Sequence, residues 1–151
     1  MLTIDEGASA DYGTFDEAWT EFIGAVRRSR GRASRERGLE LSMSQYHLLE
    51  ALADADGLYV GRLAEAAGVA PPTATRMLDG LERDGVVRRR SCPRDRRAVA
   101  VSLTPRGREL VDAKREALAE RRRALFQALE PEERAQAARI LRRLAQVIDE
   151  L

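Results

Sequence analysis

The sequence predicts a mainly α-helical fold with one small β-hairpin, in which further helices flank a central segment. Two observations carry this prediction. Apolar residues recur at helical spacing through most of the 151 residues. Only the stretch from residue 86 to residue 104 has the pattern of two strands joined by a turn. The single cysteine excludes an intrachain disulfide, and a chain of this length can bury a sufficient core without one.

The N-terminal segment predicts a tail followed by a long helix. Residues 1–13 are polar and have no period, so we expect a mobile tail. Thr14 and Glu17 have the spacing of a capping box, which predicts a helix from Thr14 to about Arg37, with Gly38 as its stop. One face of this helix is apolar and consists of Phe15, Ala18, Trp19, Phe22, Ile23 and Val26.

Residues 41–104 have the pattern of a helix-turn-helix followed by a hairpin. Ser44 is the expected cap of a helix that ends before Gly57. "GRLAEAAG" then predicts a short helix stopped by Gly68, and "VAPPTATRMLDGLERDG" predicts a second helix that ends at Gly85. The strands "VVRRR" and "AVAVSLT", separated by the turn "SCPRDR", form a wing after this pair. The expected inward residues of the first of these helices are Leu41, Leu48, Leu49 and Leu52. The apolar set of the helix-turn-helix is Leu63, Ala67, Val69, Ala74, Met77, Leu78 and Leu81.

Residues 105–151 predict two more helices. Thr104 caps the first, with Pro105 at its first position, and the second begins at Pro131. Their apolar stripes, together with the stripe in residues 14–40, exceed what a winged helix-turn-helix over 41–104 needs. Surplus apolar surface predicts a partner, most simply a second copy of the chain. We therefore expect residues 14–40 and 105–151 to form the interface of a homodimer.

The charge distribution favours a polyanion as the partner of the central segment. The net charge is +1, but residues 1–24 carry six acids and no base, and residues 62–108 carry eleven arginines and five acids. Six of the ten residues from 88 to 97 are arginine. A local basic field attracts a polyanion whatever the net charge. The helix-turn-helix order and this charge predict binding to double-stranded DNA.

The second helix of the pair supplies the candidate base-reading residues. Its exposed first turns reach base edges when such a helix lies in the major groove, where Arg can bond guanine and Thr can touch thymine. The candidates are Pro72, Thr73, Thr75 and Arg76.

The hairpin supplies candidate backbone contacts. Arg94, Arg96 and Arg97 lie at or near its tip, which has the reach and charge for a minor groove. Side chains alternate along a strand, so Arg88 and Arg90 are candidates for phosphate and Arg89 faces the other side. For Asp95, the one acid of the cluster, we expect a brace in which it accepts from Arg97 or from turn amides.

These residues carry a family resemblance. "DRRAVAVSLT", from Asp95 to Thr104, and "PPTATRMLDGLERDGVV" resemble the wing signature and the recognition helix of the multiple-antibiotic-resistance regulator (MarR) family. The resemblance implies a homodimeric winged-helix transcription factor in which Thr75 and Arg76 read bases and Asp95 and Arg97 brace the wing. It also implies that a small phenolic or anionic effector can release the DNA. Ala70 and Pro71 depart from the Ser-type helix cap of many members.

The remaining candidates have plainer alternatives. Cys92 sits among arginines, which favour its thiolate, but incidental placement is the simpler interpretation of this wing cysteine. Trp19, Phe22, Tyr46 and His47 could line an effector cavity, or could serve packing alone.

The sequence argues against several other classes. One histidine and one cysteine predict no metal site, and we expect no cofactor and no catalytic group. The acidic N-terminus and the lack of a long apolar run predict a cytoplasmic protein without a membrane span. We expect a regulator, in the first instance a repressor, acting on a pseudo-palindromic operator. The alternative is a winged helix that binds proteins rather than specific DNA.

Overall fold

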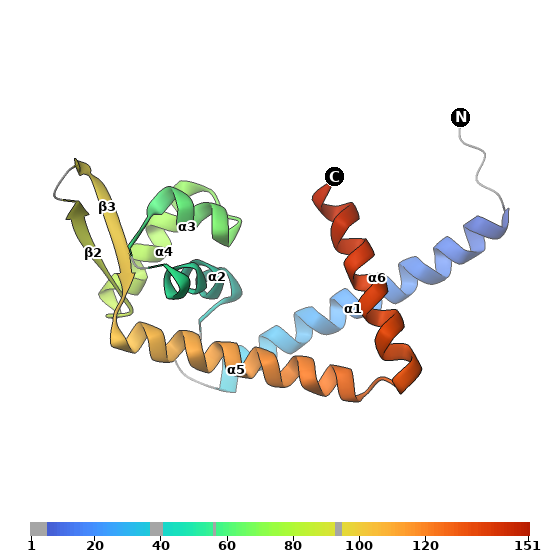
Figure 1. Cartoon of the computed structure of the whole chain (residues 1–151). Helices are drawn as coiled ribbons and strands as arrows, with labels where there is room; N and C mark the ends of the chain where they lie inside the picture. Colours follow the sequence, from blue (N-terminus) through green and yellow to red (C-terminus); the bar gives the residue numbers. More distant parts are fainter. Residues whose placement is uncertain (1–5, 37–40, 56, 93–94) are drawn as a thin grey trace. The chain divides into compact units, whose positions relative to one another are not determined.

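The described residues form six helices and three strands, the mainly helical fold with a hairpin that the sequence predicts (Figure 1). The computed structural model describes residues 6–36, 41–55, 57–92 and 95–151, and their side chains except at 6–10, 30–36, 92 and 95–98. The chain divides into two units, Met1–Ser42 and Met43–Leu151, and each is described by itself.

The first unit contains the helix α1 (Glu6–Glu36), which is longer than the sequence predicts. The prediction of a start at Thr14 is wrong, because residues 6–13 of the expected tail are helical. Gly7 and Gly13 each cost about 1 kcal/mol relative to alanine in a helix, which is too little to end one of 31 residues. The expected stop, Gly38, lies outside the described residues. The large aromatic side chains of α1 are exposed, and Phe15 and Trp19 stack with their ring centroids 6.2 Å apart.

The second unit begins with the winged helix-turn-helix. It contains α2 (Met43–Asp54), β1 (Leu58–Tyr59), α3 (Val60–Ala67), α4 (Pro71–Arg83), β2 (Val87–Cys92) and β3 (Asp95–Leu103). The strands form an antiparallel sheet in the order β1-β3-β2. Apolar side chains from α2, α3 and α4 meet those of the sheet and of the following helix in one core. Its largest fully buried members are Leu48, Leu49, Leu63, Leu78, Val86, Val101 and Val111.

Three local predictions in this unit need correction. Ser44 lies inside α2 and is not its cap, because the helix begins at Met43, directly after the buried Leu41 and the exposed Ser42. The two-residue strand β1, which is too short to show a period, was not expected. The hairpin strands are also longer than predicted and leave only residues 93–94 between them, since long arginine side chains can alternate along a paired strand and stay solvated.

The helix α5 (Pro105–Gln127) is fixed to the wing by its first turn. The Thr104 hydroxyl accepts from the Gly107 N–H at 3.1 Å, which confirms the predicted cap. The same hydroxyl lies 2.6 Å from the Gly85 carbonyl oxygen, to which it donates, and the Thr104 N–H donates to Val86 O at 3.1 Å. This junction ties the start of α5 to the end of α4 and the start of the hairpin.

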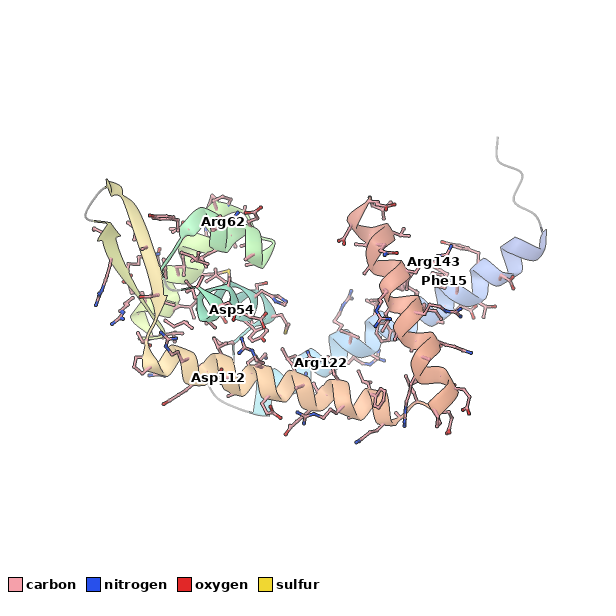
Figure 2. The ribbon with its side chains drawn as sticks, viewed as in Figure 1. Phe15, Asp54, Arg62, Asp112, Arg122 and Arg143 are labelled. Atoms are coloured by element: carbon pink, nitrogen blue, oxygen red, sulfur yellow. The ribbon has the colours of Figure 1, made fainter. Side chains whose placement is uncertain are left out.

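The last helix, α6 (Pro131–Asp149), begins in a capping box formed by Glu130 and Glu133. At the α5–α6 turn, the Arg134 guanidinium lies 4.5 Å from the centre of the Phe126 ring and donates to the carbonyls of Phe126 and Leu129. No described residue of α6 is buried within the single chain. Side chains project from both helices along this part of the chain, among them Arg122 on α5 and Arg143 on α6 (Figure 2). The large apolar side chains exposed there are Leu125, Phe126, Ile140, Leu141, Val147, Ile148 and Leu151.

Candidate nucleic-acid interface

The turn between α3 and α4 sets the direction of the second helix. Gly68 ends α3 with φ of 62°, a left-handed conformation that glycine adopts without a Cβ penalty. Ala70 precedes α4 in an extended conformation and makes no side-chain cap, which confirms the departure noted at this position. Pro71 follows at the first helical position, where its missing N–H costs nothing. A proline therefore supports this start without a Ser-type cap.

One face of α4 is buried and the opposite face is exposed. Ala74, Leu78 and Leu81 enter the core. The predicted base-reading residues all lie exposed in the first two turns: Pro72, Thr73, Thr75 and Arg76. The start of α4 therefore presents two hydroxyls and one guanidinium to the outside.

Two of these side chains differ in how much of their hydrogen-bonding capacity is free. The Thr75 hydroxyl donates to the Pro71 carbonyl oxygen at 3.0 Å, so its one donor is used within the helix, while the residue itself is exposed. Arg76 makes no hydrogen bond or ion pair with any other residue in the described part of the chain. A guanidinium carries five N–H donors, and a free one can bond both acceptors of a guanine edge.

The arginines of β2 divide between the two sides of the strand, as the sequence predicts. Arg88 and Arg90 are exposed, and the Arg88 Nε donates to the Ser102 hydroxyl at 3.2 Å. Arg89 points the other way, toward α4, and only 23% of its side chain is exposed. Its guanidinium bonds Asp79 at 2.6 Å and Glu82 at 3.1 Å, so it pairs within the protein. Asp79 and Glu82 were not among the residues predicted from the sequence, although their i,i+3 spacing in the predicted helix was a visible signal.

The structure describes the predicted minor-groove residues only in part. Arg94 lies outside the described residues, and for Asp95, Arg96 and Arg97 the structure describes only the backbone, at the start of β3. A register shift between Ser91 and Cys92 marks an irregularity just before the tip. The Asp95–Arg97 brace, the minor-groove contact and the role of Cys92 therefore stay predictions.

The predicted effector pocket draws on both units. Trp19 and Phe22 are exposed on α1, in the first unit. In the second unit Tyr46 is buried, and its ring centroid lies 5.6 Å from that of the half-exposed His47. Burial, and then the hydrogen bond to Glu50, raise the pKa of the Tyr46 phenol above its usual 10.0. The two pairs lie in units described separately, so the pocket stays a prediction.

Other kinds of site find no support in the described residues. Within them, no group of three His, Cys, Asp or Glu side chains is placed to hold a metal ion. Among the helices described, none is long and apolar enough to cross a bilayer.

The helix-turn-helix, the exposed start of α4 and the arginine-bearing hairpin define a winged-helix protein of the nucleic-acid-binding type. Comparison with known proteins makes the class more specific. The sequence model of the MarR family matches residues 41–99. An HTH-type transcriptional regulator of Mycobacterium bovis and one of Mycobacterium tuberculosis are each 37% identical over 95 residues, which span 63% of this chain and 66% of each relative.

Solved structures share the fold over most of the chain. The YusO protein from Bacillus subtilis is 28% identical, with a TM-score of 0.70 over 92% of this chain and 97% of its own. FabT of Streptococcus pneumoniae, solved in complex with DNA, is 22% identical, with a TM-score of 0.79 over 92% of this chain and 98% of its own. Residues 41–99 of the chain match the MarR family, as the wing and recognition-helix motifs predict.

Proposed function

We propose that this protein is a homodimeric, sequence-specific double-stranded DNA-binding transcriptional regulator that acts as a repressor. The observation that carries the proposal is the exposed start of α4, where Thr75 and Arg76 stand on a helix fixed by its buried face. Arg88 and Arg90 on the adjacent hairpin add cationic surface for phosphate. Base-edge donors on a rigid helix supply sequence preference, and the cations supply affinity.

Dimerisation is part of this proposal, and the exposed apolar side chains of α5 and α6 support it. Leu141 and Ile148 are 61% and 58% exposed in the single chain and lie on one side of α6, seven residues apart. The exposed aromatic side chains of α1 add further apolar surface of the kind that seeks a partner. A two-fold dimer would present two copies of α4 to successive major grooves on one face of a pseudo-palindromic operator, about 10 base pairs apart.

Release by a small phenolic or anionic effector completes the proposed regulation. Tyr46 and His47 offer adjacent aromatic rings on α2, and the Nε of Arg115 on α5 lies 3.9 Å from Glu50, the carboxylate that accepts from the Tyr46 phenol. A ring with a carboxylate fits such a set, because it can stack and pair with a cation. With a hydroxybenzoate as probe, we expect displacement of bound DNA, and His47→Ala should raise the concentration needed. If His47→Ala leaves the hydroxybenzoate concentration for half-displacement of DNA unchanged, His47 is not part of the effector site.

Selection of bound fragments from the source genome, followed by footprinting, tests the function. We expect a small set of fragments with paired half-sites, bound in preference to random duplex. If the dimer makes about 6–10 phosphate contacts, its affinity should fall by about 10³–10⁵ between 50 and 200 mM salt. Equal binding to every duplex would instead support the protein-interaction alternative.

Arg76→Ala tests the placement of the recognition helix. We expect it to relax the preference for one base pair in each half-site and to cost about 1–3 kcal/mol of specific binding. Arg122→Ala, on the part of α5 beyond the winged helix (Figure 2), is a matched control that removes the same charge. Unchanged site preference in Arg76→Ala would contradict the placement.

A further inference from the structure

Arg89 binds α4 at more points than any other side chain of the hairpin that the structure describes. Its Nη1 donates to Asp79 Oδ1 at 2.6 Å and to Glu82 Oε2 at 3.1 Å, and its Nη2 donates to the Thr75 carbonyl oxygen at 3.4 Å. The backbone N–H of Arg89 donates to the other Glu82 oxygen at 3.3 Å. Glu82 therefore holds both the main chain and the side chain of this strand position.

The strand register explains why Arg89 can reach the helix. Arg89 lies opposite Val101, and Val87 lies opposite Leu103. Residues at i and i+2 share one face of a strand, so Arg89 is on the same face as buried Val87, while Arg88 and Arg90 are on the other. The half-buried guanidinium of Arg89 contacts Asp79 and Glu82, which lie about one helical turn apart on α4.

The contact to the Thr75 carbonyl brings this network to the base-facing turn. Thr75 and Arg76 are the central base-reading candidates, and the carbonyl between their side chains accepts from Arg89. A shift of the hairpin that breaks these bonds also removes this contact to the turn that presents Arg76. The hairpin and the start of α4 are joined through one side chain.

The two acids are unfavourable for DNA binding by charge alone. Asp79 and Glu82 are 52% and 41% exposed on the helix proposed to approach phosphate, and carboxylates there repel it. Arg89 directs its Nη1 at these two acids and its Nη2 at the Thr75 carbonyl. Such an arrangement fits a role in geometry and not a direct phosphate contact. Arginine suits it, because its planar fork directs several donors at once, whereas lysine offers a single point charge.

We propose that Arg89 is a positioning residue: through Asp79, Glu82 and the Thr75 carbonyl it holds the wing and the recognition helix in one arrangement for DNA. The inference rests on the proposed DNA-binding function. It assigns the sequence preference of the protein in part to a residue that does not touch DNA.

The double variant Asp79→Asn, Glu82→Gln gives the sharpest test, because simple electrostatics predicts a change in the affinity for all DNA alike and the positioning role predicts a change in the ratio of affinities. It makes the DNA-facing surface more positive by two charges, so simple electrostatics predicts tighter binding to every duplex. The positioning role predicts that the ratio of affinities for a selected genomic fragment and a random duplex of equal length falls about 5- to 30-fold. Glu65→Gln on α3 is the matched control, since it removes an exposed, arginine-paired carboxylate elsewhere in the domain.

Arg89→Gln and the triple variant separate positioning from phosphate contact. Arg89→Gln should lower the same ratio to a similar extent, and Arg89→Lys should lower it less. The triple variant should lose no more than either parent, because residues that act through one network are not additive. Equal losses on both duplexes in Arg89→Gln, or additive losses in the triple variant, would overturn the proposal.

The wild-type measurement distinguishes the two levels of failure. A wild-type protein without preference for any fragment removes the proposed function, and this inference with it. If the wild-type protein prefers the selected fragment and both Arg89→Gln and the double variant keep that preference, only the positioning role of Arg89 is removed. Thermal unfolding of each free variant, at one protomer concentration, checks that the proteins compared are folded.

Discussion

Gly107 is the position where the junction between the wing and α5 leaves no room for a side chain. A Cβ built on Gly107 would overlap the Val86 carbonyl oxygen and lie 3.1 Å from Leu103 Cδ2 and 3.2 Å from the Val86 carbonyl carbon. Two of these atoms are backbone, so a rotamer change cannot relieve the clash. In Gly107→Ala the first turn of α5 must therefore move away from the start of the hairpin.

Two contributions lower the free energy of unfolding of Gly107→Ala, and a third raises it. Overpacking a filled site costs about 1–3 kcal/mol. The displaced turn also weakens the Thr104 cap, whose hydroxyl accepts from the Gly107 N–H, at a cost of about 0.5–2 kcal/mol. Alanine returns about 0.5–1 kcal/mol through its better helix propensity. We expect a net loss of about 1–4 kcal/mol in the free energy of unfolding.

Urea unfolding of the full chain at fixed protomer concentration measures this loss. Gly80→Ala is the matched control: Gly80 lies within α4, and a Cβ there meets nothing within 4 Å. The control should gain about 0.4–1 kcal/mol, since alanine fits and restricts the unfolded chain. If Gly107→Ala and Gly80→Ala change stability in the same direction, the account of this junction is wrong.

Three further predictions address the cap, a titrating group and the dimer. Thr104→Ala should cost about 0.5–2 kcal/mol by urea unfolding, while Thr104→Ser, which keeps the hydroxyl, should restore most of it; equal losses would contradict the cap. The Tyr46 phenol has a raised pKa in the folded chain, so its contribution to stability is full below pH 10.0 and is lost as pH rises through the folded pKa. Tyr46→Phe should flatten that alkaline loss in thermal melts, and an equally steep loss would exclude Tyr46 as its source. Leu141→Asp should give a folded monomer by sedimentation, whereas a persistent dimer would place the interface elsewhere.

The sequence predicted the central segment best, because its local signals agree with its packing. The four leucines expected to point inward from Leu41 to Leu52 are all buried. Gly68 and Thr104 end and begin helices where predicted, since each has a conformation or a hydrogen bond that local sequence can specify. The start of α1 was missed because a long helix tolerates two glycines, and β1 because two residues show no period.

The candidate interface was predictable in part. Exposure of Thr75 and Arg76 follows from helical periodicity, and the orientation of Arg89 follows from strand alternation. The partners of Arg89 could not be read in this way, because Asp79 and Glu82 meet it only when β2 folds back along α4. Contacts between elements depend on tertiary packing, whereas exposure depends on local period.

The most direct test of the account is the ratio of affinities of the wild-type protein for a fragment selected from the source genome and for random duplex of equal length. The account predicts a ratio of about 10³ or more at physiological salt, as specific regulators show. It also predicts that Arg76→Ala lowers this ratio, while Arg122→Ala leaves it unchanged. A ratio near one for the wild-type protein would contradict the central claim that α4 reads the sequence of DNA.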